Sequence, residues 1–354
     1  MRIASGPWLK NIVLMLASVV LTFGVAEVAL RLSHRIPTNS LRSPDLRTLE
    51  AQPGLFQPDQ DFIDRLNPAL PYRVRTNSAG FRGPEFAIEK PAGCLRILCV
   101  GDSYTFGPYV QEDQSLPGVL GRLLARRTPP AVEVINGGAS GFTILDERRF
   151  LEERALAIAP DIVLLFFCQN DIRDLGQKRA TIDLMRDHAA TKSMPLLGPM
   201  IGLLQQTALF NAMQKVSAQM WVRRRAAQQP VLSRNETGHW EIYRTNLRAM
   251  ADLLARRRIR WMVVAWPSAQ QLGGSESLEP QERLEGLARE AGVPFLDLTP
   301  ALQDLRRKGE RAYLVPLDGH PSAAGYEASA RAVAERLLQL GYLPPSDLLP
   351  GVQD

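Results

Sequence analysis

Residues 95 to 107 read LRILCVGDSYTFG, and the chain changes character at residue 101. The first six residues are apolar except for one arginine, which is typical of a buried strand in a parallel sheet. Gly101, Asp102 and Ser103 follow that strand directly. Ligands of open parallel sheets bind beyond the carboxyl ends of the strands, so Ser103 stands where a reactive side chain is expected.

The same alternation of strand and helix extends outward from this stretch. Apolar, β-branched runs predict strands at 95–100, 132–136, 161–167, 259–266 and 293–298. Helical patterns separate them at about 115–127, 144–158, 240–257, 279–291 and 322–340. Strands that are apolar on both faces and alternate with helices predict an α/β, doubly wound fold, in which helices cover both faces of a parallel sheet.

Residues 1–32 are predicted to form a membrane anchor or a signal. Residues 12–25 carry no charge and Glu27 interrupts the apolar run only near its end, whereas about 20 apolar residues suffice to cross a bilayer. Gly24 and Ala26 are small enough for signal cleavage, but the apolar pattern continues through Leu32, which favours an uncleaved anchor. Charges flank both ends and leave the orientation open; the signal-like layout predicts a periplasmic or otherwise extracytoplasmic catalytic domain.

The remaining boundaries follow from composition and spacing. We expect a linker at 33–75, a catalytic domain at 76–342 with a helical insertion at 175–238, and a C-terminal tail at 343–354. Within the insertion, residues 200–222 have apolar residues at helical spacing. Packing of this helix onto the domain is favoured over a membrane-surface or lid role, because amphipathic helices commonly face a core.

Composition excludes several classes of protein. The formal charge is +5, with 42 basic and 37 acidic residues. The basic residues are spread along helices, with no interleaved aromatic ladder or zinc-finger spacing, so no nucleic-acid partner is predicted. The three cysteines form neither a disulfide framework nor a metal-ligand pattern. Asp102 could bind a metal, but no second clustered ligand is evident, so neither a metal nor a cofactor is predicted.

Four polar segments are expected at one rim of the sheet: GDS at 101–103, NGGASG at 136–141, CQND at 168–171 and LDGHPSAAGY at 317–326. A nucleophilic serine needs a base, an acid that orients the base, and donors for the oxyanion. Ser103 would be the nucleophile, His320 the base and Asp318 the orienting acid. Candidate oxyanion donors are the backbone N–H groups of Ser103 and Gly138 and the side-chain amide of Asn170. Gly138 lacks a Cβ, so its amide could approach a substrate carbonyl closely.

Each segment alone has a plainer explanation. Gly-Asp-Ser and Asn-Asp are common Asx-type turns, and the glycine-rich segment could be an ordinary loop. Ser322 could simply cap the last helix, with His320 in solvent. Only the combination, in which each segment is assigned to the same rim of one sheet, favours catalysis. The α/β-hydrolase Gly-x-Ser-x-Gly elbow, the phosphate-binding P-loop and the dinucleotide-binding glycine spacing are all missing from these segments.

Together the four segments resemble the blocks of the SGNH, or GDSL-type, hydrolase family, over about residues 75–340. The resemblance implies a flavodoxin-like three-layer sandwich with Ser103 as nucleophile and with Asp318 and His320 in the last block. It also implies an oxyanion hole built from Ser103, Gly138 and Asn170. Asp102 and Asp171 are expected to support the site.

Two positions depart from the family pattern. Cys168 stands where the third block usually begins with glycine, and the last block reads Asp318-Gly319-His320 instead of D-x-x-H. The D-x-H spacing resembles the branch that includes polysaccharide O-acetyltransferases and deacetylases. The segment TNSAGFRGPEF at 76–86, together with the N-terminal anchor, resembles bacterial membrane-anchored members of the superfamily.

Three functions remain open at this point. The first is a membrane-anchored serine esterase that hydrolyses a small acyl ester, with acetyl on an envelope carbohydrate as the candidate substrate. The second is an O-acyltransferase that passes the same acyl group to a polysaccharide hydroxyl. The third is a non-catalytic carbohydrate-binding protein, which has no need for Ser103, Asp318 and His320 together.

Overall fold

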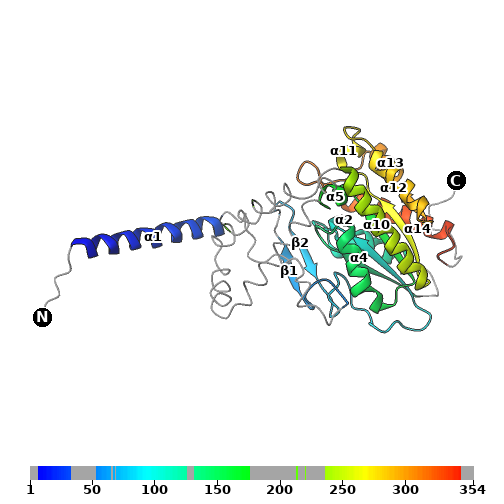
Figure 1. Ribbon diagram of the computed structural model, residues 1–354, viewed down its shortest axis with the longest axis horizontal. Coiled ribbons are helices and arrows are strands. Elements are labelled where there is room, and N and C mark those ends of the chain that lie inside the picture. Colours follow the sequence, from blue (N-terminus) through cyan, green and yellow to red (C-terminus); the bar gives the residue numbers. More distant parts are fainter. Residues whose placement is uncertain are drawn as a thin grey trace. The chain divides into compact units, whose positions relative to one another are not determined.

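The computed structural model describes residues 7–32, 53–64, 67, 69–125, 131–175, 213, 220 and 236–343. The chain divides into two compact units (Figure 1). One unit contains helix α1 (Pro7–Leu32), and the other contains the remaining described helices and strands, including the predicted catalytic residues.

The catalytic unit is built on a five-stranded parallel sheet in the order β4-β3-β5-β6-β7. The strands are β3 (Leu95–Gly101), β4 (Val132–Gly138), β5 (Ile162–Phe167), β6 (Arg260–Ala265) and β7 (Phe295–Asp297). This is the flavodoxin-like strand order, in which the direction of winding reverses between β3 and β5. Asp102 and Cys168 follow the carboxyl ends of these two strands.

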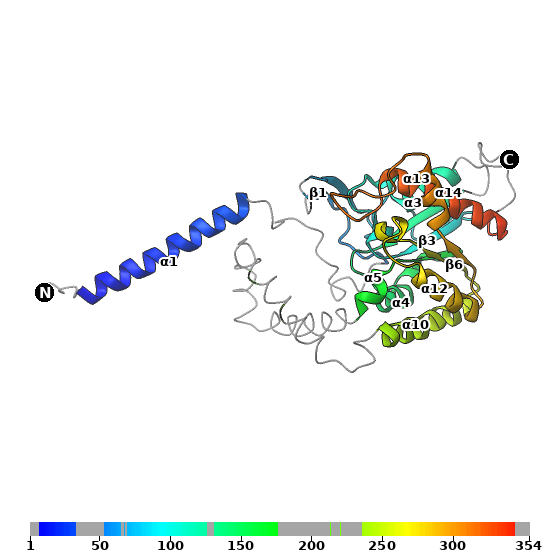
Figure 2. The ribbon, with the colours of Figure 1, turned by 90° about the horizontal axis from the view of Figure 1, so that it is seen from above.

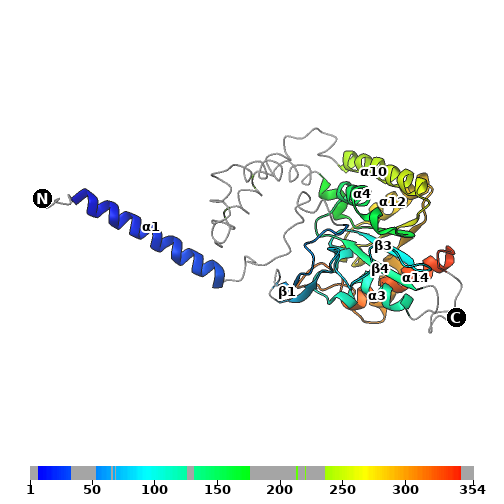
Figure 3. The ribbon, with the colours of Figure 1, turned by 90° about the horizontal axis from the view of Figure 1, so that it is seen from below.

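Helices cover both faces of the sheet, as Figure 2 and Figure 3 show from two sides. One face carries α4 (Ile144–Glu153), α10 (Glu236–Arg256) and α12 (Glu279–Glu290). The other carries α3 (Leu116–Ala125), α13 (Thr299–Arg307) and α14 (Ala323–Gln339). Alternate residues of each central strand enter the two cores: Leu98 and Val100 face the first set of helices, and Ile97 and Cys99 face the second. The predicted three-layer α/β sandwich is confirmed.

Several short elements were not expected from the sequence. They are α2 (Ser103–Phe106), η1 (Glu112–Gln114), α5 (Asn170–Arg173) and α11 (Ala269–Leu272). The longer α13 was not predicted either, and η2 (Ala155–Ile158) lies inside the helix predicted at 144–158. Elements of one turn show no helical periodicity in sequence, because a period of 3.6 residues needs several turns to repeat. The helix predicted at 144–158 is interrupted at Arg154, where α4 ends and η2 begins.

The predicted linker at 33–75 is too long. Strands β1 (Asp61–Asp64) and β2 (Tyr72–Arg75) pair antiparallel within it, and Leu55 and Phe56 are buried in the core. In β2, Tyr72 and Val74 are buried while the two arginines are exposed. This period-two pattern is the signature of a half-buried strand, but four residues are too few to stand out from the surrounding prolines and arginines.

Helix α1 fits a membrane anchor or a signal sequence. Its apolar stretch Lys10–Ala29 has 20 residues, a mean hydropathy of 2.3 and no buried share. At 1.5 Å per residue such a stretch is about 30 Å long, which matches the hydrocarbon core of a bilayer. Most of the insertion predicted at 175–238, including the helix expected at 200–222, lies outside the described residues, as does the predicted tail beyond residue 343.

Candidate active site

The stretch GDSYTFG forms a single helical turn that is capped at both ends. Asp102 accepts a hydrogen bond from the Tyr104 N–H at 2.9 Å, which caps the start of α2. Gly107 ends the turn in the left-handed region, with φ 80°, and its N–H donates to the Ser103 carbonyl at 2.9 Å. Ser103 is therefore the first residue of α2, directly beyond the carboxyl end of β3.

The predicted nucleophile, base and acid lie in one hydrogen-bonded row. Ser103 Oγ is 2.8 Å from His320 Nε2, and His320 Nδ1 is 2.5 Å from Asp318 Oδ1. A carboxylate only accepts, so the proton between His320 and Asp318 belongs to Nδ1, and this leaves Nε2 as the acceptor that faces Ser103. The His320 and Asp318 side chains are 23% and 21% exposed, so the row is open to a substrate at one side.

The loop that carries His320 is closed on itself. The Leu314 N–H donates to the His320 carbonyl at 2.9 Å, and Ser322 caps α14 by accepting from the Gly325 N–H at 3.1 Å. The Tyr104 hydroxyl donates to the Gly319 carbonyl at 2.9 Å and so ties this loop to α2. Ser322 does cap the last helix, as the plainer explanation held, and His320 contacts Ser103 as well.

Asp318 is held in its ionised form. Partial burial opposes ionisation, but hydrogen bonds from the side chain and backbone of His320 outweigh it and lower the pKa of Asp318 below its ordinary value. An ionised carboxylate at this position orients the imidazole and stabilises the positive charge that forms when His320 takes a proton.

Asp102 links the first segment to the third. Its Oδ2 accepts from Asn170 Nδ2 at 2.8 Å and from Cys168 Sγ at 3.1 Å, and Ser103 Oγ lies 3.4 Å away. Asp102 is only 1% exposed. Asn170 is thereby held close to Ser103, with one of its two amide N–H groups directed to Asp102.

The second segment packs against α2 and holds the predicted oxyanion donor Gly138. Gly138 is buried, and its N–H donates to Asn136 Oδ1 at 3.0 Å, so in this structure that N–H is occupied. Glycine is required here because a Cβ would lie 2.3 Å from the Phe106 nitrogen in α2. Asn136 also donates to the Phe106 carbonyl at 3.1 Å and thus ties the end of β4 to α2.

Comparison with known proteins decides the family. Residues 99–328, which include all four segments, match the model of the GDSL-like lipase/acylhydrolase family. The chain belongs to this family. Members hydrolyse ester bonds, so the chain is an ester hydrolase. The predicted family membership is therefore confirmed.

Solved structures of the family are similar only at a distance. A GDSL-family lipolytic protein from Desulfitobacterium hafniense is 18% identical with a TM-score of 0.40, and 68% of this chain and 98% of that chain are covered. A lipase/acylhydrolase from Enterococcus faecalis is 18% identical with a TM-score of 0.42, and the match covers 72% of this chain and 100% of that chain. An acetylxylan esterase from Geobacillus stearothermophilus is 17% identical with a TM-score of 0.42, and the match covers 70% of this chain and 95% of that chain. Comparison with curated proteins returned no match.

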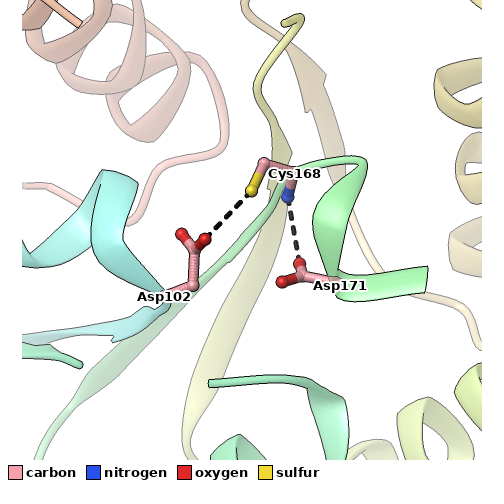
Figure 4. Close-up of side chains that lie close together, drawn as sticks. All are labelled: Asp102, Cys168 and Asp171. Carbon is pink, nitrogen blue, oxygen red and sulfur yellow. Dashed lines mark hydrogen bonds between the residues drawn. The ribbon is translucent and has the colours of Figure 1, made fainter. Parts of the chain in front are cut away.

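One expectation about this GDSL-family site is wrong: Asp102 does have clustered neighbours. Possible ligand atoms of Asp102, Cys168 and Asp171 lie within 4.8 Å of one another (Figure 4). Burial, and then the nearby Asp102 and Asp171, raise the pKa of Cys168 well above its ordinary value. The Cys168 thiol lies within hydrogen-bond distance of Asp102 Oδ2 and of Asn170 Oδ1, and the Cys168 N–H donates to Asp171 at 3.0 Å. Hydrogen bonds through Cys168 thus join the three residues of the cluster.

Tyr104 and Asn136 are the site residues that sequence reasoning missed. Tyr104 immediately follows the serine and Asn136 immediately precedes the glycines of the second segment, so their positions were the available signal. Tyr104 and Asn136 are not the nucleophile, base or orienting acid of a serine hydrolase, so a search for those three residues passes over them. Their contacts with Gly319 and with Phe106 position the segments of the GDSL-family site relative to each other.

Proposed function

We propose that this chain is a membrane-anchored serine esterase in which Ser103, His320 and Asp318 carry the reaction. The observation that supports the proposal most is the continuous row of contacts from Asp318 through His320 to Ser103, at 2.5 and 2.8 Å. These distances are within the range required for proton transfer between a nucleophile and its general base.

The reaction has two halves, acylation and deacylation of Ser103, and in each half His320 first accepts a proton and then donates it. Ser103 Oγ attacks the ester carbonyl while its proton passes to His320 Nε2. Collapse of the tetrahedral intermediate breaks the bond to the alcohol, which leaves with the proton from Nε2. Water then attacks the acyl group on Ser103, gives its proton to Nε2, and Ser103 recovers that proton as the acid is released.

The negative oxygen of the tetrahedral intermediate needs hydrogen-bond donors. We assign the Ser103 N–H, which has no partner inside α2 because it is the first N–H of that helix, and the second N–H of the Asn170 amide. The Gly138 N–H remains a third candidate, but it can serve only if Asn136 Oδ1 releases it.

The proposed substrate is a small acyl ester, with acetyl on an envelope carbohydrate as the preferred class. Two features support this choice. The Asp318-Gly319-His320 spacing resembles the branch with polysaccharide deacetylases and O-acetyltransferases, and α1 would hold an extracytoplasmic domain beside the cell envelope. No part of the mechanism requires a cofactor.

The direct test compares the hydrolysis of p-nitrophenyl acetate by the wild type and by Ser103→Ala. We expect a loss of at least about 1,000-fold in kcat, in line with the removal of a serine nucleophile in other hydrolases. Ser275→Ala, a change at an exposed serine, serves as the control. Equal rates for the wild type and Ser103→Ala would contradict the proposal and favour the non-catalytic carbohydrate-binding alternative.

The spacing of the last segment also favours a second candidate, an O-acyltransferase that uses the same acyl-enzyme. Hydrolysis and transfer differ only in whether water or a sugar hydroxyl reaches the acyl group. Incubation of the purified chain with p-nitrophenyl acetate and an envelope oligosaccharide, followed by mass measurement of the sugar, distinguishes them. A gain of acetyl on the sugar would favour transfer, and free acetate alone would favour hydrolysis.

A further inference from the structure

Tyr109 has an unusual backbone conformation close to the catalytic row. Its φ is +65°, in the left-handed region that residues other than glycine rarely adopt. For a bulky side chain this conformation is strained. A glycine at this position would remove the strain, so the retained tyrosine points to a use for its side chain.

The segment around Tyr109 is held firmly by Arg82. This arginine is 1% exposed, and its guanidinium donates to the carbonyls of Phe106, Gly107 and Val110. It also lies over the Phe106 ring, 4.7 Å from the centroid. Because these contacts fix the chain on both sides of Tyr109, the strained residue cannot relax without breaking buried hydrogen bonds.

The ring of Tyr109 lies against the catalytic histidine. Its centroid is 5.6 Å from that of His320, in an edge-to-face arrangement with an interplanar angle of 69°. Tyr104 contacts the same imidazole at 5.3 Å and 56°. Edge-to-face packing is a preferred geometry of aromatic rings. The imidazole therefore packs against two tyrosines, each of which restricts its rotation.

The negative charge of Asp318, the third member of the row, acts on Tyr109. Burial, followed by the charges of Asp318 and Asp64, raises the pKa of Tyr109 to about 12. The ring of Tyr72 also packs edge-to-face against Tyr109, with centroids 5.6 Å apart and an interplanar angle of 72°.

We propose that Tyr109 is a positioning residue for the catalytic row: its ring fixes the plane of the His320 imidazole. The inference rests on the proposed roles of Ser103, His320 and Asp318. Tyr109 itself takes no proton from the substrate and forms no bond to it. Its effect is on the alignment of His320 Nε2 with Ser103 Oγ.

The test uses the full chain in detergent and three variants of Tyr109. Tyr109→Gly keeps the left-handed backbone and removes the ring, Tyr109→Asn does the same with a residue that tolerates this conformation, and Tyr109→Phe keeps the ring but removes the hydroxyl. Arg258→Gly is the matched control, because Arg258 is exposed and also has a positive φ, of 56°. Kinetics with p-nitrophenyl acetate and the downfield proton resonance of His320 Nδ1–H are measured for each.

We expect Tyr109→Gly and Tyr109→Asn to lower kcat by about 10- to 100-fold, with KM changed less than about threefold, because misalignment of catalytic groups costs rate more than binding. Tyr109→Phe should recover most of the lost kcat. The Nδ1–H resonance should broaden or shift in the glycine and asparagine variants. Arg258→Gly should match the wild type in kcat and in this resonance.

Two results would overturn the inference. One is wild-type kcat in both Tyr109→Gly and Tyr109→Asn. The other is a loss of activity that only follows the loss of folded protein, with the Nδ1–H resonance of the folded fraction unchanged. Activity that survives Ser103→Ala or His320→Ala would instead refute the proposed function, so the two failures are distinguishable.

Discussion

Asp318 Oδ1 accepts from two donors of the same residue, the ring Nδ1 of His320 at 2.5 Å and its backbone N–H at 2.9 Å. The D-x-H spacing makes this possible, because a carboxylate can bond the backbone N–H two residues further along in an Asx-type turn. One turn therefore orients the imidazole and also fixes the loop that carries it.

Replacement of Asp318 by asparagine should lower kcat/KM by about 1,000-fold or more, because an amide no longer stabilises the imidazolium and can favour the wrong tautomer. The lowered pKa of Asp318 also contributes stability above its ordinary range, which is lost as pH falls through the folded-state value. Asp318→Asn should lose this acid-side dependence. Steady-state kinetics and acid unfolding of the variant check both points, with the exposed Asp252→Asn as control. Unchanged kinetics in Asp318→Asn would contradict the assignment.

At the residue scale, the sequence predicts chemistry better than hydrogen-bond direction. Ser103, His320 and Asp318 could be predicted because the four polar segments together suit one rim of the sheet, although their joint catalytic role is still a proposal. The occupied N–H of Gly138 could not be foreseen, because it depends on where Asn136 directs its side chain. Tyr109 was missed because its backbone conformation has no signal in the sequence.

Two buried acidic residues lie on helices close to the site. Glu147 of α4 and Asp171 of α5 are both fully buried. Within the described residues, both carboxylate oxygens of Glu147 and Oδ1 of Asp171 have no hydrogen-bond partner. Burial, and then neighbouring negative charges that include Asp102, raise the pKa of both residues well above their ordinary values. Each therefore favours its protonated form in the folded chain.

Such a carboxyl keeps its proton in the folded chain at a pH where the unfolded chain has released it, so stability falls as pH rises between the two pKa values. Each carboxyl contributes a slope of up to about 1.4 kcal/mol per pH unit. Glu147→Gln removes one contribution, so its free energy of unfolding should fall less steeply than that of the wild type above about pH 5.

Urea unfolding of the solubilised chain at a series of pH values measures these slopes. Glu153→Gln is the matched control, because Glu153 lies on the same helix and is exposed. The free energy of unfolding of this control should change with pH as steeply as that of the wild type. If the free energy of unfolding of Glu147→Gln also changes with pH as steeply as that of the wild type, the folded chain does not hold an extra proton at Glu147.

At the element scale, the predictable parts were those with repeated periodicity. The five strands and the helices between them carry long apolar patterns, and their ends fall within a few residues of the predicted positions. The β1–β2 hairpin and α2 are four-residue elements, and they form because of contacts with the rest of the fold. Arg82 illustrates this: it reads as a surface arginine in the sequence, yet it is buried against three carbonyls.

At the scale of the whole molecule, α1 should decide where the enzyme resides. An arginine at the centre of a membrane-spanning helix costs about 2.5 to 3.5 kcal/mol. Leu21→Arg should therefore move a substantial share of the full chain from the carbonate-washed membrane fraction to the soluble fraction. Lys10→Arg, which keeps the charge at the end of the apolar stretch, should stay with the membrane. Equal distribution of the two variants would contradict anchoring by α1.

The central claim, that Ser103 is the nucleophile activated by His320, is tested most directly by the site of covalent modification. The purified chain is treated with a serine-directed fluorophosphonate and mapped by peptide mass spectrometry, with His320→Ala in parallel. We predict one label per chain, on Ser103, with activity lost in proportion and with labelling of His320→Ala slowed by at least about 100-fold. A label on another residue of the inactivated chain, or full activity with Ser103 labelled, would contradict the account.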